Sequence, residues 1–205
     1  MKKIILFFLA VSLSAISYAQ FHIGAQIGYT ASNISLDVDS IKTDMKSNFL
    51  VGAFVRLGRK IYIQPEVNYL TQGSVFKWPS LNNLSPLEQT VTIKTLQVPV
   101  NLGWKIIDAK IFNIRLFGGA VMDFHLNTEI EDTGDSEEYD KLVPEDFKDM
   151  TWQWDAGVGV DVLMFAVDVK YVGGITNIFK DLQYENGEIT SKSSLFMVTL
   201  GWKIF

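Results

Sequence analysis

The sequence predicts an all-β fold: one eight-stranded antiparallel up-and-down transmembrane β-barrel, preceded by a cleavable signal peptide. Three observations predict it. The N-terminus has the composition of a secretory signal, eight later segments alternate between apolar and polar residues, and the connections between those segments are short and long in turn.

The N-terminal segment is predicted to direct export. Lys2 and Lys3 precede an apolar run from Ile4 to Val11, and Ser17 and Ala19 place small residues where a signal peptidase cleaves. The apolar run is about ten residues long, whereas a membrane-spanning helix needs about 20. We therefore expect a signal peptide over residues 1–19 and one outer-membrane β-barrel domain over residues 20–205.

Composition excludes several classes of function. The chain has no cysteine, which rules out disulfides and thiolate zinc sites. Without residues 1–19 it carries 16 Lys and Arg against 23 Asp and Glu, a net charge of −7. Binding to nucleic acid needs a basic surface, so we expect no nucleic-acid partner. We also expect no cofactor.

Eight segments alternate with a period of two, the spacing of a β-strand that has one apolar and one polar face. In the first segment, the apolar series from Phe21 to Tyr29 alternates with His22, Gly24, Gln26 and Gly28. A change of phase near Thr95 predicts a β-bulge beside the fourth segment. The eight segments cover residues 21–30, 49–57, 61–69, 96–106, 112–126, 152–162, 165–171 and 196–204.

The connections between these segments orient the barrel. Long polar connections are predicted at residues 35–47, 72–89, 128–151 and 179–192, and tight turns at 58–60, 107–110 and 163–164. Outer-membrane barrels have short periplasmic turns and long extracellular loops. Both ends of the barrel domain are therefore expected on the periplasmic side, as an even number of strands requires.

Alternation alone does not say which face lines the barrel, because a soluble carrier of the lipocalin type has the same period with the faces exchanged. A polar interior is favoured because the polar face carries charges of both signs and the other face is apolar along each strand. Trp and Tyr near the strand ends predict two interfacial girdles. The girdle residues are Trp104 and Trp202 near the short turns, with Tyr29, Tyr69, Trp152 and Trp154 near the long loops. The interior charges are Arg56, Glu66, Lys105, Arg115, Asp123, Asp155, Asp161, Asp168, Lys170 and Lys203.

Five short motifs occur in order along the predicted barrel domain. They are Ile63-Gln64-Pro65-Glu66-Val67-Asn68-Tyr69, Leu96-Gln97-Val98-Pro99-Val100, Gly157-Val158-Gly159-Val160, Tyr171 with Gly174-Ile175-Thr176-Asn177-Ile178, and Gly201-Trp202-Lys203-Ile204-Phe205. Together they resemble the PorT-like outer-membrane β-barrel family of Bacteroidota. The resemblance implies a porin-like or uncharacterised barrel of the outer membrane, and the founding member of that family serves a protein-secretion system.

The C-terminal residue bears on assembly. Phe205 supplies a terminal aromatic residue, which the β-barrel assembly machinery commonly recognises. The usual signal has apolar residues in phase with that aromatic, whereas Lys203 and Gly201 share the parity of Phe205. We therefore expect Phe205 to lie beyond the last paired residue.

The chain has two histidines, and neither predicts an active site. His22 lies near the periplasmic end of the first strand. His125 lies near the extracellular end of the fifth strand, on the same face as Asp123, and a carboxylate can orient an imidazole. No motif ties a serine to this pair. We expect a hydrogen-bond network at the lumen rim, and we assign no catalytic, cofactor-binding or metal-binding residue.

The net negative charge is concentrated between Thr128 and Met150, a segment with ten acidic and two basic residues. Such a cluster is typical of a solvated loop. The alternatives are binding of a basic partner, bridging to lipopolysaccharide through divalent ions, or a Ca²⁺ site. The carboxylates available for a Ca²⁺ site are Glu129, Glu131, Asp132, Asp135, Glu137 and Glu138.

Together these features predict a structural or interaction barrel without catalysis. Its extracellular loops would contact lipopolysaccharide or other proteins of the cell envelope. The first alternative is a porin-like channel for small solutes, and the second is an outer-membrane component that assists protein secretion. An eight-stranded lumen is largely filled by side chains, which favours the interaction role over the channel.

Overall fold

The computed structural model describes residues 21–36, 42–78, 87–133, 143–179, 183–184, 187–188 and 191–204. The predicted signal peptide and Phe205 lie outside these residues. No helix in the described ranges is long and apolar enough to cross a membrane. In chain order the elements are β1 (Phe21–Leu36), β2 (Lys42–Gly58), β3 (Ile61–Trp78), β4 (Leu87–Asp108), β5 (Phe112–Thr133), the 3₁₀ helix η1 (Pro144–Asp146), β6 (Met150–Val162), β7 (Phe165–Gly174), β8 (Gln183–Tyr184), β9 (Gly187–Glu188) and β10 (Ser191–Lys203).

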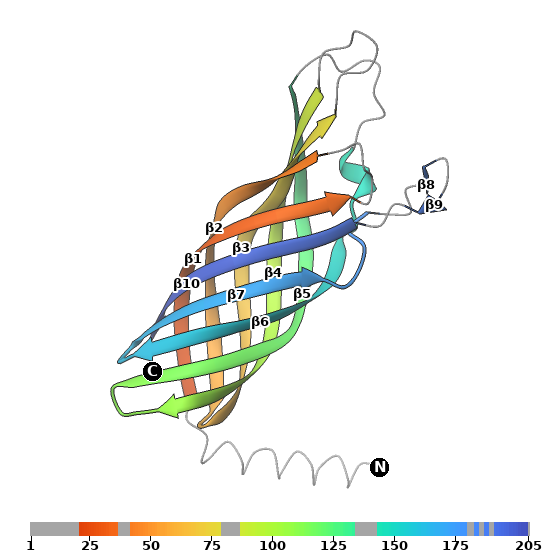
Figure 1. Cartoon of the computed structure of the whole chain (residues 1–205). Coiled ribbons are helices and arrows are strands. Elements are labelled where there is room, and N and C mark those ends of the chain that lie inside the picture. The colour runs from red at the N-terminus through yellow and green to blue at the C-terminus, as the bar shows by residue number, and fades with distance from the viewer. Residues whose placement is uncertain are drawn as a thin grey trace, which may run out of the picture.

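Eight of these strands form a closed antiparallel barrel in the order β1-β10-β7-β6-β5-β4-β3-β2 (Figure 1). Successive barrel strands are paired, with β10 next to β7 because β8 and β9 lie outside the barrel. β1 closes the barrel by pairing with β10, from Gly24 opposite Lys203 to Leu36 opposite Ser191. The two-residue strands β8 and β9 form a small separate hairpin. The predicted eight-stranded up-and-down topology is confirmed.

The two faces of the wall are those that the alternation predicted. Residues on the apolar parity point outward and are exposed, for example Ile27 at 60% and Trp202 at 55%. Residues on the polar parity point inward and are buried, for example Gln26 at 3% and Arg115 at 0%. An apolar outer surface suits contact with lipid, and it excludes the soluble-carrier alternative, whose outer face would be polar.

The tight turns depend on unusual backbone conformations. Gly58 ends β2 with a φ of 127°, and a Cβ there would lie 2.3 Å from the carbonyl oxygen of Ile61. Leu163 adopts a φ of 52° in the two-residue connection between β6 and β7. Because the barrel has an even number of antiparallel strands, β1 begins and β10 ends at the same end of the barrel as the three short turns (Figure 1). This is the periplasmic end by the rule for outer-membrane barrels.

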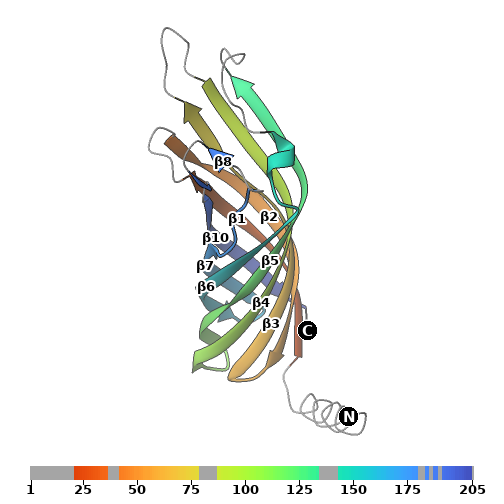
Figure 2. The same cartoon turned by 90° about the vertical axis from the view of Figure 1, so that its right-hand side faces the viewer.

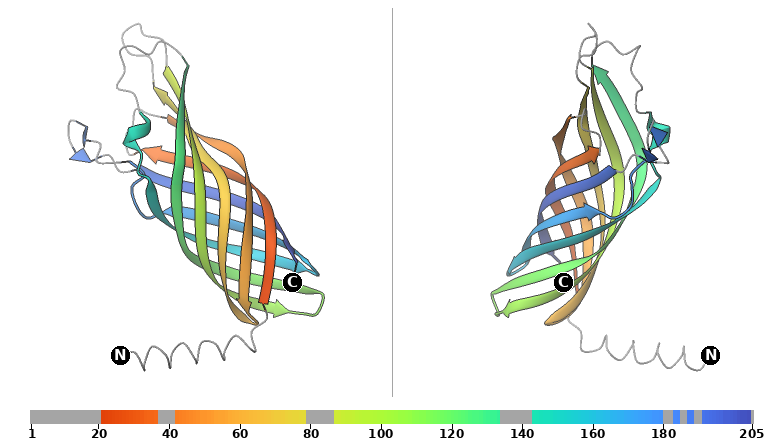
Figure 3. Two further views of the ribbon diagram at one scale, coloured as in Figure 1. Left: turned by 180° about the vertical axis from the view of Figure 1, so that it is seen from behind. Right: turned by 45° about the vertical axis from the view of Figure 1, so that its right-hand side comes forward.

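The strands at the opposite end are longer than predicted. Residues 128–133 were predicted to begin a loop, but they continue β5 and pair with β4, from Thr128 opposite Ile93 to Thr133 opposite Glu88. Most of the predicted connection at residues 72–89 is likewise strand, because β3 runs to Trp78 and β4 starts at Leu87. The predicted connection at residues 35–47 is strand up to Leu36 and again from Lys42. Figures 2 and 3 show β3, β4 and β5 rising past the other strands at this end.

The predicted bulge is present, but its extra residue lies in the partner strand. The register between β4 and β5 shifts between Lys94, opposite Asn127, and Thr95, opposite His125. Leu126 is thus the additional residue, and it belongs to β5. The bulge therefore does not cause the change of phase in β4. The phase changes because Val91 and Ile93 point to the inner side of the wall and are fully buried, unlike the apolar residues that follow Thr95.

Candidate functional site

An ion pair in the lumen joins opposite parts of the barrel wall. Lys170 on β7 donates from Nζ to Oε2 of Glu66 on β3 at 2.8 Å, and both side chains are at most 2% exposed. Gln26 and Asn68 also donate to Oε2, at 3.0 and 3.1 Å. Gln64 donates to Oε1 at 2.9 Å. Both oxygens of the buried carboxylate therefore accept hydrogen bonds.

A second cluster of charges lies nearer the periplasmic end and centres on Asp161. Arg56 Nη1 lies 2.7 Å from Asp161 Oδ2, and Arg115 Nη2 lies 2.9 Å from Asp161 Oδ1. Arg115 Nη2 also lies 2.5 Å from Oδ1 of Asp168. The ring of Tyr62 lies 4.9 Å from the Arg56 guanidinium, and its hydroxyl accepts a hydrogen bond from Arg115 at 3.1 Å. The two arginines thus form a network that spans five strands.

An apolar cluster lies in the lumen on the other side of the Glu66–Lys170 pair. Leu70 follows Glu66 on β3 and Val172 follows Lys170 on β7, so the cluster lies nearer the extracellular end. This cluster was not predicted, because the inward face was expected to be polar along its whole length. The sequence does contain a sign of the cluster, because apolar residues occupy several positions of the inward-facing parity. The members are Leu50, Leu70, Val121, Val172, Leu195 and Met197.

These side chains leave little room for a channel. The interior of an eight-stranded barrel is just wide enough to be filled by side chains. Here two charged clusters and one apolar cluster follow one another along the axis, and their members are at most 5% exposed. The predicted plugged interior agrees with this arrangement.

His125 and Asp123 share the inward face, but their hydrogen bonds go to different partners. His125 Nδ1 lies 2.5 Å from the carbonyl oxygen of Lys148. Asp123 Oδ2 accepts from the amides of Gln72 at 3.1 Å and Gln153 at 2.9 Å. Gln72 Nε2 also lies 3.5 Å from His125 Nε2, so an amide connects the two residues. This is a hydrogen-bond network of the kind expected at the lumen rim.

His22 belongs to a cavity at the periplasmic end, which we call the mouth cavity. It has a volume of about 320 Å³ and opens between the tight turns. This cavity was not predicted from the sequence, although Arg59, Lys105 and Lys110 all lie at or beside predicted short turns. The described residues that line it are His22, Arg59, Lys105, Asp108, Ala109, Lys110, Asn113, Asp161, Leu163 and Lys203.

The acidic segment from Thr128 to Met150 is only partly a loop. Glu129 and Glu131 lie on β5, and Glu129 forms an exposed ion pair with Lys94 of β4 at 2.6 Å. Asp135, Glu137 and Glu138 lie outside the described residues, as does the side chain of Asp132. Over the residues that are described, no group of three or more His, Asp or Glu side chains is arranged to hold a metal ion.

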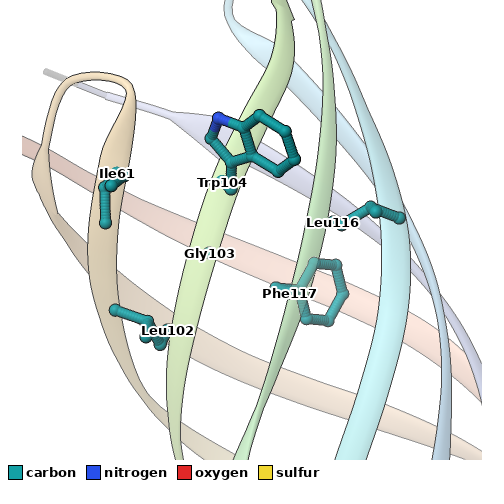
Figure 4. Close-up of a pocket in the computed structure, with 6 residues that line it drawn as sticks. All are labelled: Ile61, Leu102, Gly103, Trp104, Leu116 and Phe117. Atoms are coloured by element: carbon teal, nitrogen blue, oxygen red, sulfur yellow. The ribbon is translucent and has the colours of Figure 1, made fainter.

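The outer wall carries a shallow apolar groove near the periplasmic end (Figure 4). Its volume is about 460 Å³, and Gly103 lies between the side chains of Ile61, Leu102, Trp104 and Leu116. These four side chains are 43 to 66% exposed, on the face that contacts lipid. The groove is therefore part of the surface that contacts lipid. Trp104 lies near the short turns, where one of the two interfacial girdles was predicted.

A closed eight-stranded barrel with an apolar outer wall and a charged, filled lumen defines a small outer-membrane β-barrel protein. The chain belongs to the family described as outer membrane protein beta-barrel domain, whose model matches residues 15–180. The outer membrane is therefore its location.

The chain is similar to several solved structures, of which OprG supports the fold. OprG from Pseudomonas aeruginosa is 14% identical, with 90% of this chain and 95% of OprG covered at a TM-score of 0.52. The Neisserial surface protein A is 10% identical, with 91% and 99% covered at a TM-score of 0.48. Ail of Yersinia pestis is 11% identical, with 90% and 99% covered at 0.47. No curated protein matches the chain in sequence.

Proposed function

We propose that this protein is an interaction barrel, whose extracellular strand extension binds another component of the cell envelope and whose wall serves as a rigid anchor. The observation that carries the proposal is the length of β5. It continues nine residues past Phe124, which is the last β5 residue paired with β6. At roughly 3.3 Å per residue, these nine residues extend β5 by about 30 Å.

The extension is suited to contact because its side chains are exposed and charged. Glu129 is 49% exposed and pairs with Lys94 at 39%, while Glu131 and Thr133 are also exposed. Exposed ion pairs contribute little to stability. We therefore infer that the exposed charges of the extension contribute to binding a partner more than to the stability of the fold. A basic protein, or lipopolysaccharide bridged through divalent ions, fits their sign.

Site-specific photocrosslinking in the native outer membrane tests the proposal. A photoreactive residue at position 131 samples the extension, and the same residue at position 163 samples the periplasmic turn, where Leu163 is 64% exposed. We expect a reproducible product at position 131 that is absent at position 163, identified by mass spectrometry. Identical products at both positions would contradict the proposal.

The porin-like alternative has less support from the lumen. Buried ion pairs and the apolar cluster of six residues occupy the path that a solute would follow. The enzyme alternative also has little support. The ring nitrogens of His125 lie against the amide of Gln72 and the carbonyl oxygen of Lys148, so we assign no activated nucleophile.

We further propose that, within this family, the chain is related to the PorT-like barrels of Bacteroidota. The support is the five ordered motifs, two of which supply inward-facing residues, Glu66 and Gln97, both buried in the lumen. Kinship of this kind describes ancestry, and we assign no secretion role from it. A secretion defect in a deletion strain, restored by the wild-type chain, would establish that role.

A further inference from the structure

We propose that the mouth cavity is a binding site for a small oxyanion, a phosphate or carboxylate group carried by a soluble molecule of the periplasm. The cavity is a built site, because its lining comes from β1, β4, β5, β6, β10 and the tight turns. A volume of about 320 Å³ lies at the lower end of the range for ligand pockets.

Cations outnumber carboxylates in this cavity. Four cationic side chains line it, those of Arg59, Lys105, Lys110 and Lys203, against the two carboxylates of Asp108 and Asp161. The rest of the chain is acidic, so this excess of positive charge is local. The electrostatic potential in the cavity is therefore positive, and it attracts an anion that reaches the periplasmic end.

The two carboxylates do not neutralise the cations that line the cavity. Asp161 is already paired with both lumen arginines, at 2.7 and 2.9 Å, and Lys203 reaches it only at 3.4 Å. Lys105 has a side chain that is 4% exposed, and its ion pair with Asp108 is long, at 3.8 Å. Burying an ammonium group with weak pairing is costly, and a bound oxyanion would offset that cost.

The direction of approach identifies the source of the anion. Lys105 and Lys203 each follow a tryptophan, Trp104 and Trp202, that points to the lipid. Because successive side chains of a strand alternate between faces, both lysines point to the inside of the barrel. The barrel wall therefore separates them from lipid headgroups, and a ligand enters along the barrel axis from the periplasm.

Titration of the refolded full barrel in a maltoside detergent, which contains no phosphate, tests the proposal. Inorganic phosphate and acetate are added at constant ionic strength against chloride, and backbone amide resonances are followed by NMR. We expect saturable shifts at His22, Lys105, Asn113 and Lys203 with phosphate or acetate. Linear shifts equal to those caused by chloride would overturn the proposal.

Variants show whether the named lysines are responsible. Lys203→Gln and Lys105→Gln should each weaken phosphate affinity by about ten-fold, the loss of one charge-assisted hydrogen bond. Lys94→Gln, at the other end of the barrel, is the matched control and should leave the affinity unchanged. If Lys105→Gln does not fold, the exposed turn variant Lys110→Gln replaces it. Unchanged affinity in all mouth variants would contradict the assignment.

A final arm distinguishes the soluble anion from a lipid headgroup. The barrel is reconstituted in vesicles of phosphatidylcholine, with or without phosphatidylglycerol. We expect phosphate to bind equally in both. If anionic lipid alone shifts the mouth resonances and phosphate does not, the cavity is a headgroup site and our proposal is wrong. These results concern the periplasmic end, so they are independent of crosslinking at position 131.

Discussion

Glu66 and Lys170 illustrate what can be predicted for single residues of this barrel. Parity alone placed both side chains in the lumen, and the structure confirms this. Their pairing was not predictable, because the two residues are 104 positions apart. The strand tilt and the register around the whole barrel decide which inward residues contact one another. The alternation within a single strand predicts neither of them.

The ion pair predicts an asymmetric response to substitution. Lys170→Met leaves the Glu66 carboxylate buried without its cation, so we expect the free energy of unfolding to fall by about 3–5 kcal/mol. The double variant with Glu66→Gln removes both charges and should recover most of that loss. Urea unfolding in detergent micelles, followed by tryptophan fluorescence, measures both changes.

The control for this prediction is Lys94→Met, which removes an exposed lysine whose partner is also exposed. It should leave the unfolding midpoint unchanged. A single Lys170→Met variant as stable as Lys94→Met would show that the buried pair contributes nothing to the fold.

At the scale of elements, the sequence predicted each barrel strand but not where the extracellular ends lie. A strand is recognised by one apolar face, and that face disappears once the strand leaves the lipid. Residues 128–133 are mostly polar, so they resembled a loop. They remain in strand conformation because they pair with β4 as far as Thr133. Backbone pairing, which the side-chain pattern does not report, extends these strands.

Close packing of strands gives a second prediction at this scale. A Cβ on Gly119 would lie 2.1 Å from the carbonyl oxygen of Val100, whereas on neighbouring Gly118 the nearest atom is 3.0 Å away. Gly119→Ala should therefore separate β4 from β5 locally and cost about 1–3 kcal/mol of stability. Gly118→Ala should cost much less. Unfolding in urea compares the two variants, and equal losses would contradict this account of the β4–β5 contact.

For the whole molecule, the class, the strand number and the polar interior followed from the sequence. The filling of that interior followed only in part. Charges were expected there, but the apolar cluster and the mouth cavity depend on residues from many strands. Their consequence is that the two ends of the barrel differ. The extracellular end carries an acidic strand extension, and the periplasmic end carries a cavity lined by an excess of cations.

The central claim is that this barrel acts at its ends and does not conduct solutes through its lumen. Planar-bilayer recording of the refolded wild-type protein tests it most directly, with a 16-stranded porin as the positive control in the same lipid. We predict no stable open steps at any applied voltage, because the Asp161 network, the Glu66–Lys170 pair and the apolar cluster fill the lumen in series. Stable, reproducible conductance steps from the wild-type barrel would contradict the account.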